Sequence, residues 1–185
     1  EKKNRIEQMQ NLRFYFEESV KMIKNLSHEF KNINFVIRPH PNENINDWKK
    51  IIDKCEKNIF LDLSDHDITS MIIASKCVIH NSSFAGIQSS LLNKALIVYS
   101  PKKIPLPKRS FPNKLSKIAY SDNDVLILLN KIFKMKKKFL KKERFNLLKN
   151  RIFIDKKETS SSKIINDLLK FDINSKKINL LKIQI

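Results

Sequence analysis

Hydrophobic and polar residues alternate along the chain with two different periods. Between residues 5 and 31, and again between residues 45 and 55, apolar side chains recur every three or four positions. This spacing predicts amphipathic helices. A third stripe of the same kind begins after residue 122, and its apolar members are Leu128, Ile132, Met135 and Phe139.

Short runs of consecutive apolar residues lie between the helical segments and predict buried strands. The runs are at 33–38, 58–64, 77–80, 95–100 and 117–121. Short helices are expected between them, at 67–76 with Asp65 or Asp67 as N-cap, and at 83–94. A last helix is expected from about Ser161.

The order of these elements predicts an α/β fold. Strands that alternate with helices through short loops form a parallel sheet, and strands without polar alternation are covered on both faces. We therefore expect one domain over residues 1–121. Further helices, over 122–170, are expected to pack on or beside it, and the tail at 171–185 has no clear assignment.

The charge of the chain raises the question of a polyanionic partner. The formal net charge is +18 at pH 7, and a strongly basic surface attracts nucleic acid or anionic membranes. However, the lysines are spread over most segments, and no RNA-binding aromatic motif or zinc-finger spacing accompanies them. We expect no nucleic acid partner, and contact with a membrane surface stays open.

The small number of glycines excludes two phosphate-binding motifs. Gly86 is the only glycine, whereas GxGxxG and GxxxxGK[ST] loops each need at least two. Any phosphate site in this chain must use another kind of loop. The two cysteines, Cys55 and Cys77, lack CxxC spacing and are expected to be small core residues in a reducing compartment.

The first candidate site follows the predicted strand at 33–38. Arg38-Pro39-His40-Pro41 places a cation and an imidazole at the carboxyl end of that strand. The two prolines fix their φ angles and so orient His40, and both Arg38 and His40 can donate hydrogen bonds to a phosphate. The alternative is a turn that ends the strand and exposes a histidine.

The second candidate site follows the predicted strand at 77–80. His80 and Asn81-Ser82-Ser83 lie where that strand ends and the next helix begins. Unpaired N–H groups and hydroxyls at a helix N-terminus bind anions. Gly86 falls inside this helix, which indicates a close approach by a strand or a ligand. The alternative is a serine cap with ordinary helix–sheet packing.

Ligands of open α/β sheets bind outside the carboxyl ends of the strands, so the two candidate loops are expected to be neighbours. A metal site built from His40, His66 and His80 is the competing hypothesis. No pair among them has the i, i+4 spacing of helical metal ligands, and no histidine–carboxylate motif recurs. We therefore expect no metal.

Two stretches together resemble a known family. "VIRPHPNEN" is followed by a helix that contains tryptophan, and "SKCVIHNSSFAGIQSSLLNKALIVYSP" comes after it. This pattern is similar to the C-terminal half of GT-B glycosyltransferases of bacterial capsule and lipopolysaccharide synthesis, related to Kdo transferases and bacterial sialyltransferases. His40-Pro41 and Ser82-Ser83 match the motifs that bind the nucleotide-sugar donor, often a CMP-sugar. The resemblance covers roughly Phe35 to Leu169, where "IDKKETSSSKIINDLL" is similar to the family's last helix.

The resemblance implies a Rossmann-like donor-binding domain at 1–121, one half of a GT-B architecture. It implies inverting transfer in which His40 and Arg38 stabilise the leaving phosphate, while His80, Asn81, Ser82 and Ser83 hold it. Gln88 stands where many relatives carry a ribose-binding glutamate, so Gln88, with Gly86 beside it, is the candidate for the ribose. No cofactor is implied beyond the donor itself.

The resemblance also implies partners and a location. The acceptor is a glycan or a lipid-linked glycan, and the enzyme works in the cytoplasm, with peripheral contact with the inner membrane left open. The chain begins with Glu1 rather than methionine, so we expect a fragment without its N-terminal GT-B domain, which usually supplies the catalytic base.

Two other functions stay open. The first is an enzyme of the UDP-N-acetylglucosamine 2-epimerase type, which shares the two-domain architecture. The second is a non-enzymatic basic α/β module that binds membrane or nucleic acid. This second alternative depends on the lysine-rich segment at 130–151, which combines a basic face with an apolar stripe.

Overall fold

The structure is a computed structural model and describes residues 2–41, 43–53, 55–64, 67–101, 110–134 and 142–149. The chain divides into two compact units, Glu1–Phe145 and Asn146–Ile185. Of the second unit only residues 146–149 are described, as the end of a helix.

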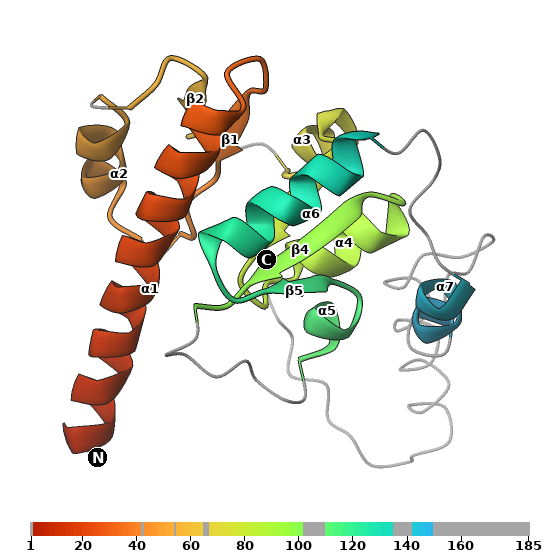
Figure 1. Cartoon of the computed structure of the whole chain (residues 1–185). Helices are drawn as coiled ribbons and strands as arrows, with labels where there is room; N and C mark the ends of the chain where they lie inside the picture. The colour runs from red at the N-terminus through yellow and green to blue at the C-terminus, as the bar shows by residue number, and fades with distance from the viewer. Residues whose placement is uncertain are drawn as a thin grey trace, which may run out of the picture. The chain divides into compact units, whose positions relative to one another are not determined.

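Helices and strands alternate through the first unit, as the sequence predicts (Figure 1). The elements, in chain order, are α1 (Lys2–Glu29), β1 (Phe35–Ile37), α2 (Ile45–Ile52), β2 (Ile59–Leu61), α3 (Thr69–Ala74), β3 (Cys77–His80), α4 (Ala85–Leu91), β4 (Ala95–Tyr99), α5 (Phe111–Lys114), β5 (Lys117–Ala119), α6 (Asp122–Lys134) and α7 (Lys142–Lys149).

All the described strand pairs are parallel, which confirms the predicted α/β, Rossmann-like fold. β1 pairs with β2, with Val36 opposite Phe60. β3 pairs with β4, and β4 with β5, so that β4 is the central strand of the second group. By hydrogen bonding the strands thus form two sheets, β1–β2 and β3–β4–β5, where the sequence suggested one.

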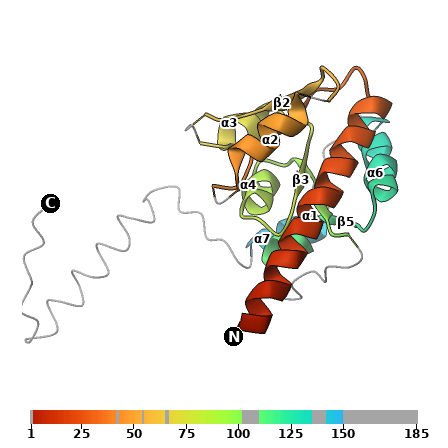
Figure 2. The same ribbon diagram turned by 90° about the vertical axis from the view of Figure 1, so that its left-hand side faces the viewer.

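The core lies on both sides of β4, whose five residues are all buried. Ile97 and Tyr99 belong to a buried cluster with Met22 and Leu26 of α1 and with residues of β5 and α6. Leu96 and Val98 alternate with them and point to the other face, where α4 packs. Figure 2 shows α1 and α6 on one side of these strands and α4 on the other. The sheet is therefore covered on both faces, as its unbroken apolar run requires.

Helix α6 buries a different face from the one that the sequence predicts. Val125 and Leu129 are its fully buried residues, while Leu128 and Ile132 are partly buried beside them. The buried stripe is therefore displaced by one position, because α6 is covered both by α1 and by the sheet. Met135 and Phe139, the helix expected from about Ser161 and the tail at 171–185 lie outside the described residues.

Helix α3 begins two residues later than expected and has no side-chain N-cap. Ile68 occupies the N-cap position, and the Asp67 carboxylate instead accepts a hydrogen bond from the Thr69 hydroxyl. The prediction of Asp67 as N-cap is therefore wrong, and Asp65 lies outside the described residues.

The structure also bears on contact with a bilayer. Within the described ranges, no helix combines the length and the apolar character needed to cross a membrane.

Candidate functional site

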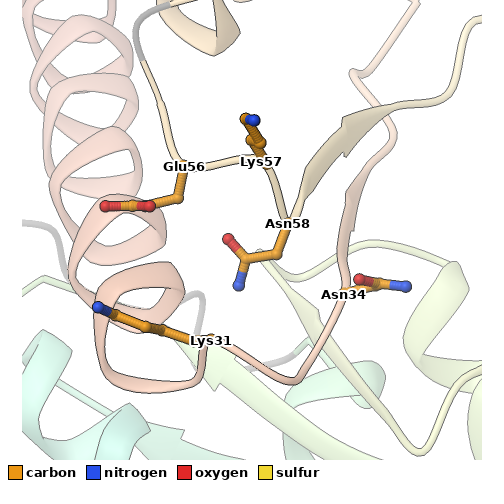
Figure 3. A pocket seen from close by; sticks show the side chains of 5 residues that line it. All are labelled: Lys31, Asn34, Glu56, Lys57 and Asn58. Atoms are coloured by element: carbon orange, nitrogen blue, oxygen red, sulfur yellow. The ribbon is translucent and has the colours of Figure 1, made fainter.

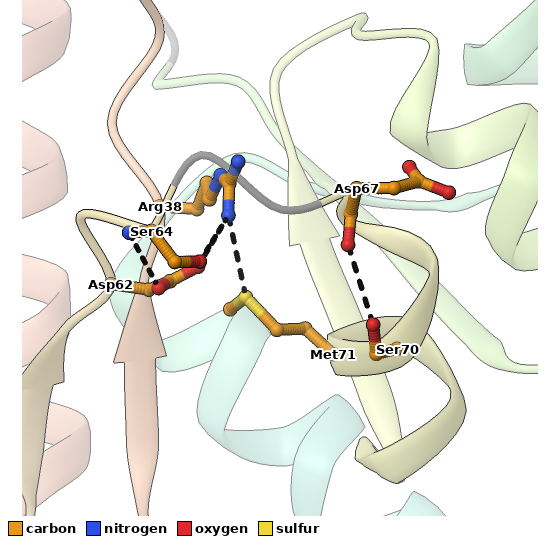
Figure 4. A network of polar contacts seen from close by, with 6 residues as sticks. All are labelled: Arg38, Asp62, Ser64, Asp67, Ser70 and Met71. Atoms are coloured by element: carbon orange, nitrogen blue, oxygen red, sulfur yellow. Dashed lines mark hydrogen bonds and ion pairs between the residues drawn. The ribbon is translucent and has the colours of Figure 1, made fainter.

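Arg38 leaves the carboxyl end of β1 and forms an ion pair with the residue that follows β2. Its guanidinium Nη1 lies 2.5 Å from Asp62 Oδ2 and 3.2 Å from the Ser64 hydroxyl, and it contacts the sulfur of Met71 at 4.0 Å (Figure 4). Hydrogen bonds from the hydroxyl and the backbone N–H of Ser64, and then the Arg38 charge, lower the pKa of Asp62 to about 2. Arg38 thus ties the ends of β1 and β2 together.

The loop that carries His40 is held through its backbone. The His40 N–H donates to Glu43 Oε2 at 3.1 Å, and the Glu43 N–H donates to the His40 carbonyl at 2.8 Å. The Trp48 indole N–H donates to the same Glu43 oxygen at 3.0 Å, and its ring packs edge-on against Phe16 at 4.8 Å between centroids. Because Trp48 is 5% exposed, it anchors the loop to the core. The His40 side chain itself lies on the surface.

His80 ends β3 and is 7% exposed. Its Nε2 lies 2.7 Å from the Ser116 hydroxyl, and burial lowers its pKa to about 4. The imidazole is therefore neutral at physiological pH and has little charge to offer a phosphate. This placement makes His80 a packing residue between β3, the Ser116 hydroxyl and Gly86.

Gly86 lies where the ring of His80 comes closest to α4. A Cβ at this position would stand 2.8 Å from His80 Nε2, 2.9 Å from its Cε1 and 3.1 Å from the Cβ of Pro112. The two distances to the ring are shorter than real Cβ contacts, so any residue other than glycine would require the ring or the helix to shift. The close approach expected at Gly86 is thus made by the imidazole of β3 and the proline of α5.

Asn81, Ser82 and Ser83 form the turn between β3 and α4. Ser82 has a φ of 50°, a left-handed conformation that is uncommon outside glycine. Its hydroxyl accepts a hydrogen bond of 2.9 Å from the side-chain amide of Asn113. Asn81 is exposed and Ser83 is half-buried, so both are within reach of a ligand at this turn.

Helix α4 begins without a side-chain cap. Phe84 occupies its N-cap position, and the Gly86 N–H donates to the Ser83 carbonyl at 3.1 Å. The serines of this turn therefore do not cap the helix. Gln88, half-buried one turn further along, is where the sequence suggested a ribose contact.

The two candidate loops are linked through helix α3. Arg38 contacts Met71 of α3, and α3 in turn packs beside α4, which carries the second loop. Both loops directly follow the carboxyl ends of parallel strands, β1 and β3.

A shallow pocket of about 290 Å³ lies at the opposite ends of β1 and β2 (Figure 3). It is lined by Lys31, Asn34, Glu56, Lys57 and Asn58, which precede these strands. None of the site residues expected from the sequence lines it. The pocket is therefore separate from the loops that carry the candidate chemistry.

The competing metal hypothesis receives no geometric support from the described residues. Among them, no group of three or more histidine, cysteine, aspartate or glutamate side chains is placed to hold a metal ion. His66 lies outside the described residues. Cys55 and Cys77 are both free thiols.

Sequence reasoning missed the residues that hold the two loops in place. Asp62, Glu43, Asn113 and Ser116 each hydrogen-bond to a loop residue or to the histidine below it. Only Asp62 gave a signal, as an acidic residue inside the otherwise apolar run predicted as a strand at 58–64. No protein-family model, no curated protein and no solved structure matches this chain.

Proposed function

We propose that this chain binds the nucleotide-sugar donor of a GT-B glycosyltransferase that builds bacterial surface polysaccharide. The observation that carries the proposal is the position of the two loops: each directly follows the carboxyl end of a parallel strand in a Rossmann-like domain. Ligands of open α/β sheets bind at this edge. The resemblance of the same two loops to donor-binding motifs supports the choice of ligand.

His40 and the turn at Asn81, Ser82 and Ser83 hold the donor phosphate in this proposal. His40 is exposed on a loop whose backbone is pinned by Glu43, so the loop loses little entropy when a ligand binds there. The serine hydroxyls supply further donors. Phosphate oxygens only accept hydrogen bonds, so such a set of donors suits them.

Arg38, His80 and Gly86 support the site rather than touch the phosphate. Arg38 is engaged by Asp62, and His80 is buried against Gly86. Gln88 keeps the role of ribose contact, because its amide both donates and accepts hydrogen bonds.

The proposed reaction is inverting displacement at the anomeric carbon. The acceptor hydroxyl forms the new bond to that carbon as the bond to the nucleotide phosphate breaks, and the phosphate leaves with the electron pair. Hydrogen bonds from His40 and the serine turn stabilise the negative charge that grows on the leaving oxygen. The acceptor hydroxyl loses its proton to a base, which the proposal places in the other half of the GT-B enzyme.

Isothermal titration calorimetry of the 185-residue chain with CMP, CDP and UDP tests the proposal. We expect one of the three to bind, and His40→Ala to weaken that binding by about tenfold, the value of one charge-assisted hydrogen bond. His28→Ala is the matched control, because His28 is an exposed histidine on α1. If none of the three nucleotides binds, the proposal is wrong.

A further inference from the structure

We propose that Asn113 is a positioning residue for phosphate recognition, acting through Ser82; this inference rests on the proposed function. Asn113 belongs to α5, thirty-one residues further along the chain, and its Nδ2 donates to Ser82 Oγ at 2.9 Å. The side chain is 8% exposed, so it can act on a ligand only through the residues that it contacts.

The direction of this hydrogen bond decides what the Ser82 hydroxyl can do. A hydroxyl has one hydrogen to donate and two lone pairs to accept with. Asn113 occupies a lone pair, and among the described residues none accepts the hydroxyl hydrogen of Ser82. Ser82 is thereby set as a donor, and a phosphate oxygen is the complementary partner.

Helix α5 is held firmly enough for Asn113 to act in this way. The Ser116 hydroxyl donates to the Pro112 carbonyl at 2.8 Å, so its oxygen accepts from His80 Nε2 at 2.7 Å. This contact fastens α5 to the end of β3, and Pro112 packs against Gly86 on the other side. The amide of Asn113 is therefore fixed relative to the turn that it contacts.

The buried side chains of Asn113 and His80, which lie around the Ser82 turn, are not arranged for stability alone. Asn113 Oδ1 and His80 Nδ1 are both buried without a hydrogen-bond partner in the described part of the chain. An unsatisfied buried polar atom destabilises the folded state. An apolar side chain at position 113 would avoid this cost but would release the left-handed Ser82 turn, whose φ of 50° needs support from its surroundings.

The test is titration calorimetry of the chain with CMP and CDP, with cytidine as the ligand that lacks phosphate, and with pyrophosphate as the ligand that lacks the nucleoside. Asn113→Asp keeps the shape of the side chain but can only accept, so it draws the Ser82 hydrogen away from the ligand. We expect Asn113→Asp and Asn113→Ala to weaken nucleotide binding about tenfold or more and to leave cytidine binding unchanged. Asn123→Ala, on the exposed face of α6, is the control.

A double variant shows whether Asn113 acts through Ser82. In a Ser82→Ala background, Asn113→Ala is expected to cause no further loss of nucleotide affinity. Thermal denaturation of each variant identifies any that does not fold, and the isosteric Asn113→Asp variant then stands in for Asn113→Ala.

The outcomes separate this inference from the proposed function. Unchanged nucleotide affinity in folded Asn113→Asp and Asn113→Ala variants overturns the role of Asn113 and leaves the proposed function standing. Equal losses for cytidine and CDP also overturn it, because they indicate a general structural role. Binding of pyrophosphate, weakened by Asn113→Asp, without binding of any nucleotide overturns the proposed function alone. If neither nucleotide nor pyrophosphate binds, both are overturned.

Discussion

The imidazole of His80 lies against the Cα of Gly86, where a methyl group would come within 2.8 Å of Nε2. This contact brings the end of β3 and the first turn of α4 closer together than any other residue would allow. It explains the position of the only glycine in the chain, inside a helix where glycine is unfavourable. Strand and helix meet directly at the turn that carries the candidate site.

Gly86→Ala is expected to destabilise the protein, although alanine favours a helix. Alanine gains about 1 kcal/mol in helix propensity, but overpacking a buried site costs about 1–3 kcal/mol. We expect a net loss of up to about 2 kcal/mol in the free energy of unfolding, measured by urea denaturation, because Ser116 holds the ring and Pro112 blocks the other side.

The control for this prediction removes the ring. In a His80→Ala background only the Cβ of Pro112, at 3.1 Å, stays close to the methyl group of Gly86→Ala, so the same substitution is expected to cost less than in the wild type. A loss of equal size in both backgrounds would mean that the clash is not with His80.

Stability is expected to fall as the pH falls from about 6.5 to about 4, because His80 is buried in its neutral form. Burial lowers its pKa from 6.5 to about 4, so within this range the unfolded chain binds more protons than the folded protein. The contribution is complete above pH 6.5 and lost below pH 4. It amounts to roughly 3 kcal/mol, from the two pKa values.

Urea denaturation at pH 7 and pH 4.5 measures this loss. His80→Gln keeps an N–H for Ser116 but does not titrate, so its stability is expected to change less between the two pH values. The other three histidines, His28, His40 and His66, are present in both proteins and cancel in the comparison. If the free energy of unfolding fell by the same amount between pH 7 and pH 4.5 in both proteins, His80 would not be the group responsible.

The fold could be predicted from the sequence because its strands are short and almost wholly apolar. Each run, such as 77–80 or 95–100, is flanked on both sides by segments with helical spacing, so it can only be interpreted as a buried strand. The division into two hydrogen-bonded sheets could not be predicted, because strand pairing depends on distant segments. Which face α6 buries depends likewise on α1, about a hundred residues earlier in the chain.

The candidate site could be predicted only as far as its loops. Arg-Pro-His-Pro and His-Asn-Ser-Ser stand out because they follow strands. What each side chain does depends on partners remote in sequence, such as Asp62 for Arg38 and Ser116 for His80. The charge of His80 depends on its burial, and the burial of a single side chain cannot be predicted from a local sequence pattern.

Asp62→Asn is expected to lower the urea midpoint, because it removes the charge that pairs with Arg38. Both side chains are partly buried, at 27% and 18% exposure. The matched control is Glu17→Gln, which breaks the ion pair with Arg13 on the surface of α1 at 83% and 56% exposure. Exposed pairs contribute little, so the control is expected to leave the midpoint unchanged.

The low pKa of Asp62 gives this prediction a second readout. The pKa in the folded protein, about 2, is below the ordinary value of 3.8, so the stability contributed by Asp62 is present above pH 3.8 and is lost as the pH falls towards 2. The difference between wild type and Asp62→Asn is therefore expected to shrink in this acid range. A difference that persists unchanged at pH 2 would contradict the ion pair as its cause.

Asn58 is expected to stabilise the end of α1 from the start of β2. Its side-chain amide donates to the carbonyls of Ser27, Phe30 and Ile33, at 3.2, 3.1 and 2.9 Å. These oxygens lie in the last turn of α1 and in the turn that follows, where helical hydrogen bonds run out. Asn58→Ala removes all three of these hydrogen bonds, after which the Phe30 carbonyl still has one donor, the Ile33 N–H at 2.9 Å. The substitution is expected to reduce the free energy of unfolding by about 1–3 kcal/mol.

Asn58→Asp distinguishes lost donors from lost packing. The aspartate has nearly the same shape but places a carboxylate against three carbonyl oxygens, so it is expected to destabilise the protein more than alanine does at pH 7. Asn34→Ala, an exposed asparagine in the same pocket, is expected to have little effect. If Asn58→Asp were as stable as wild type in urea denaturation, the amide would not be holding α1. The long helix would then owe its position to Met22 and Leu26, which pack in the core.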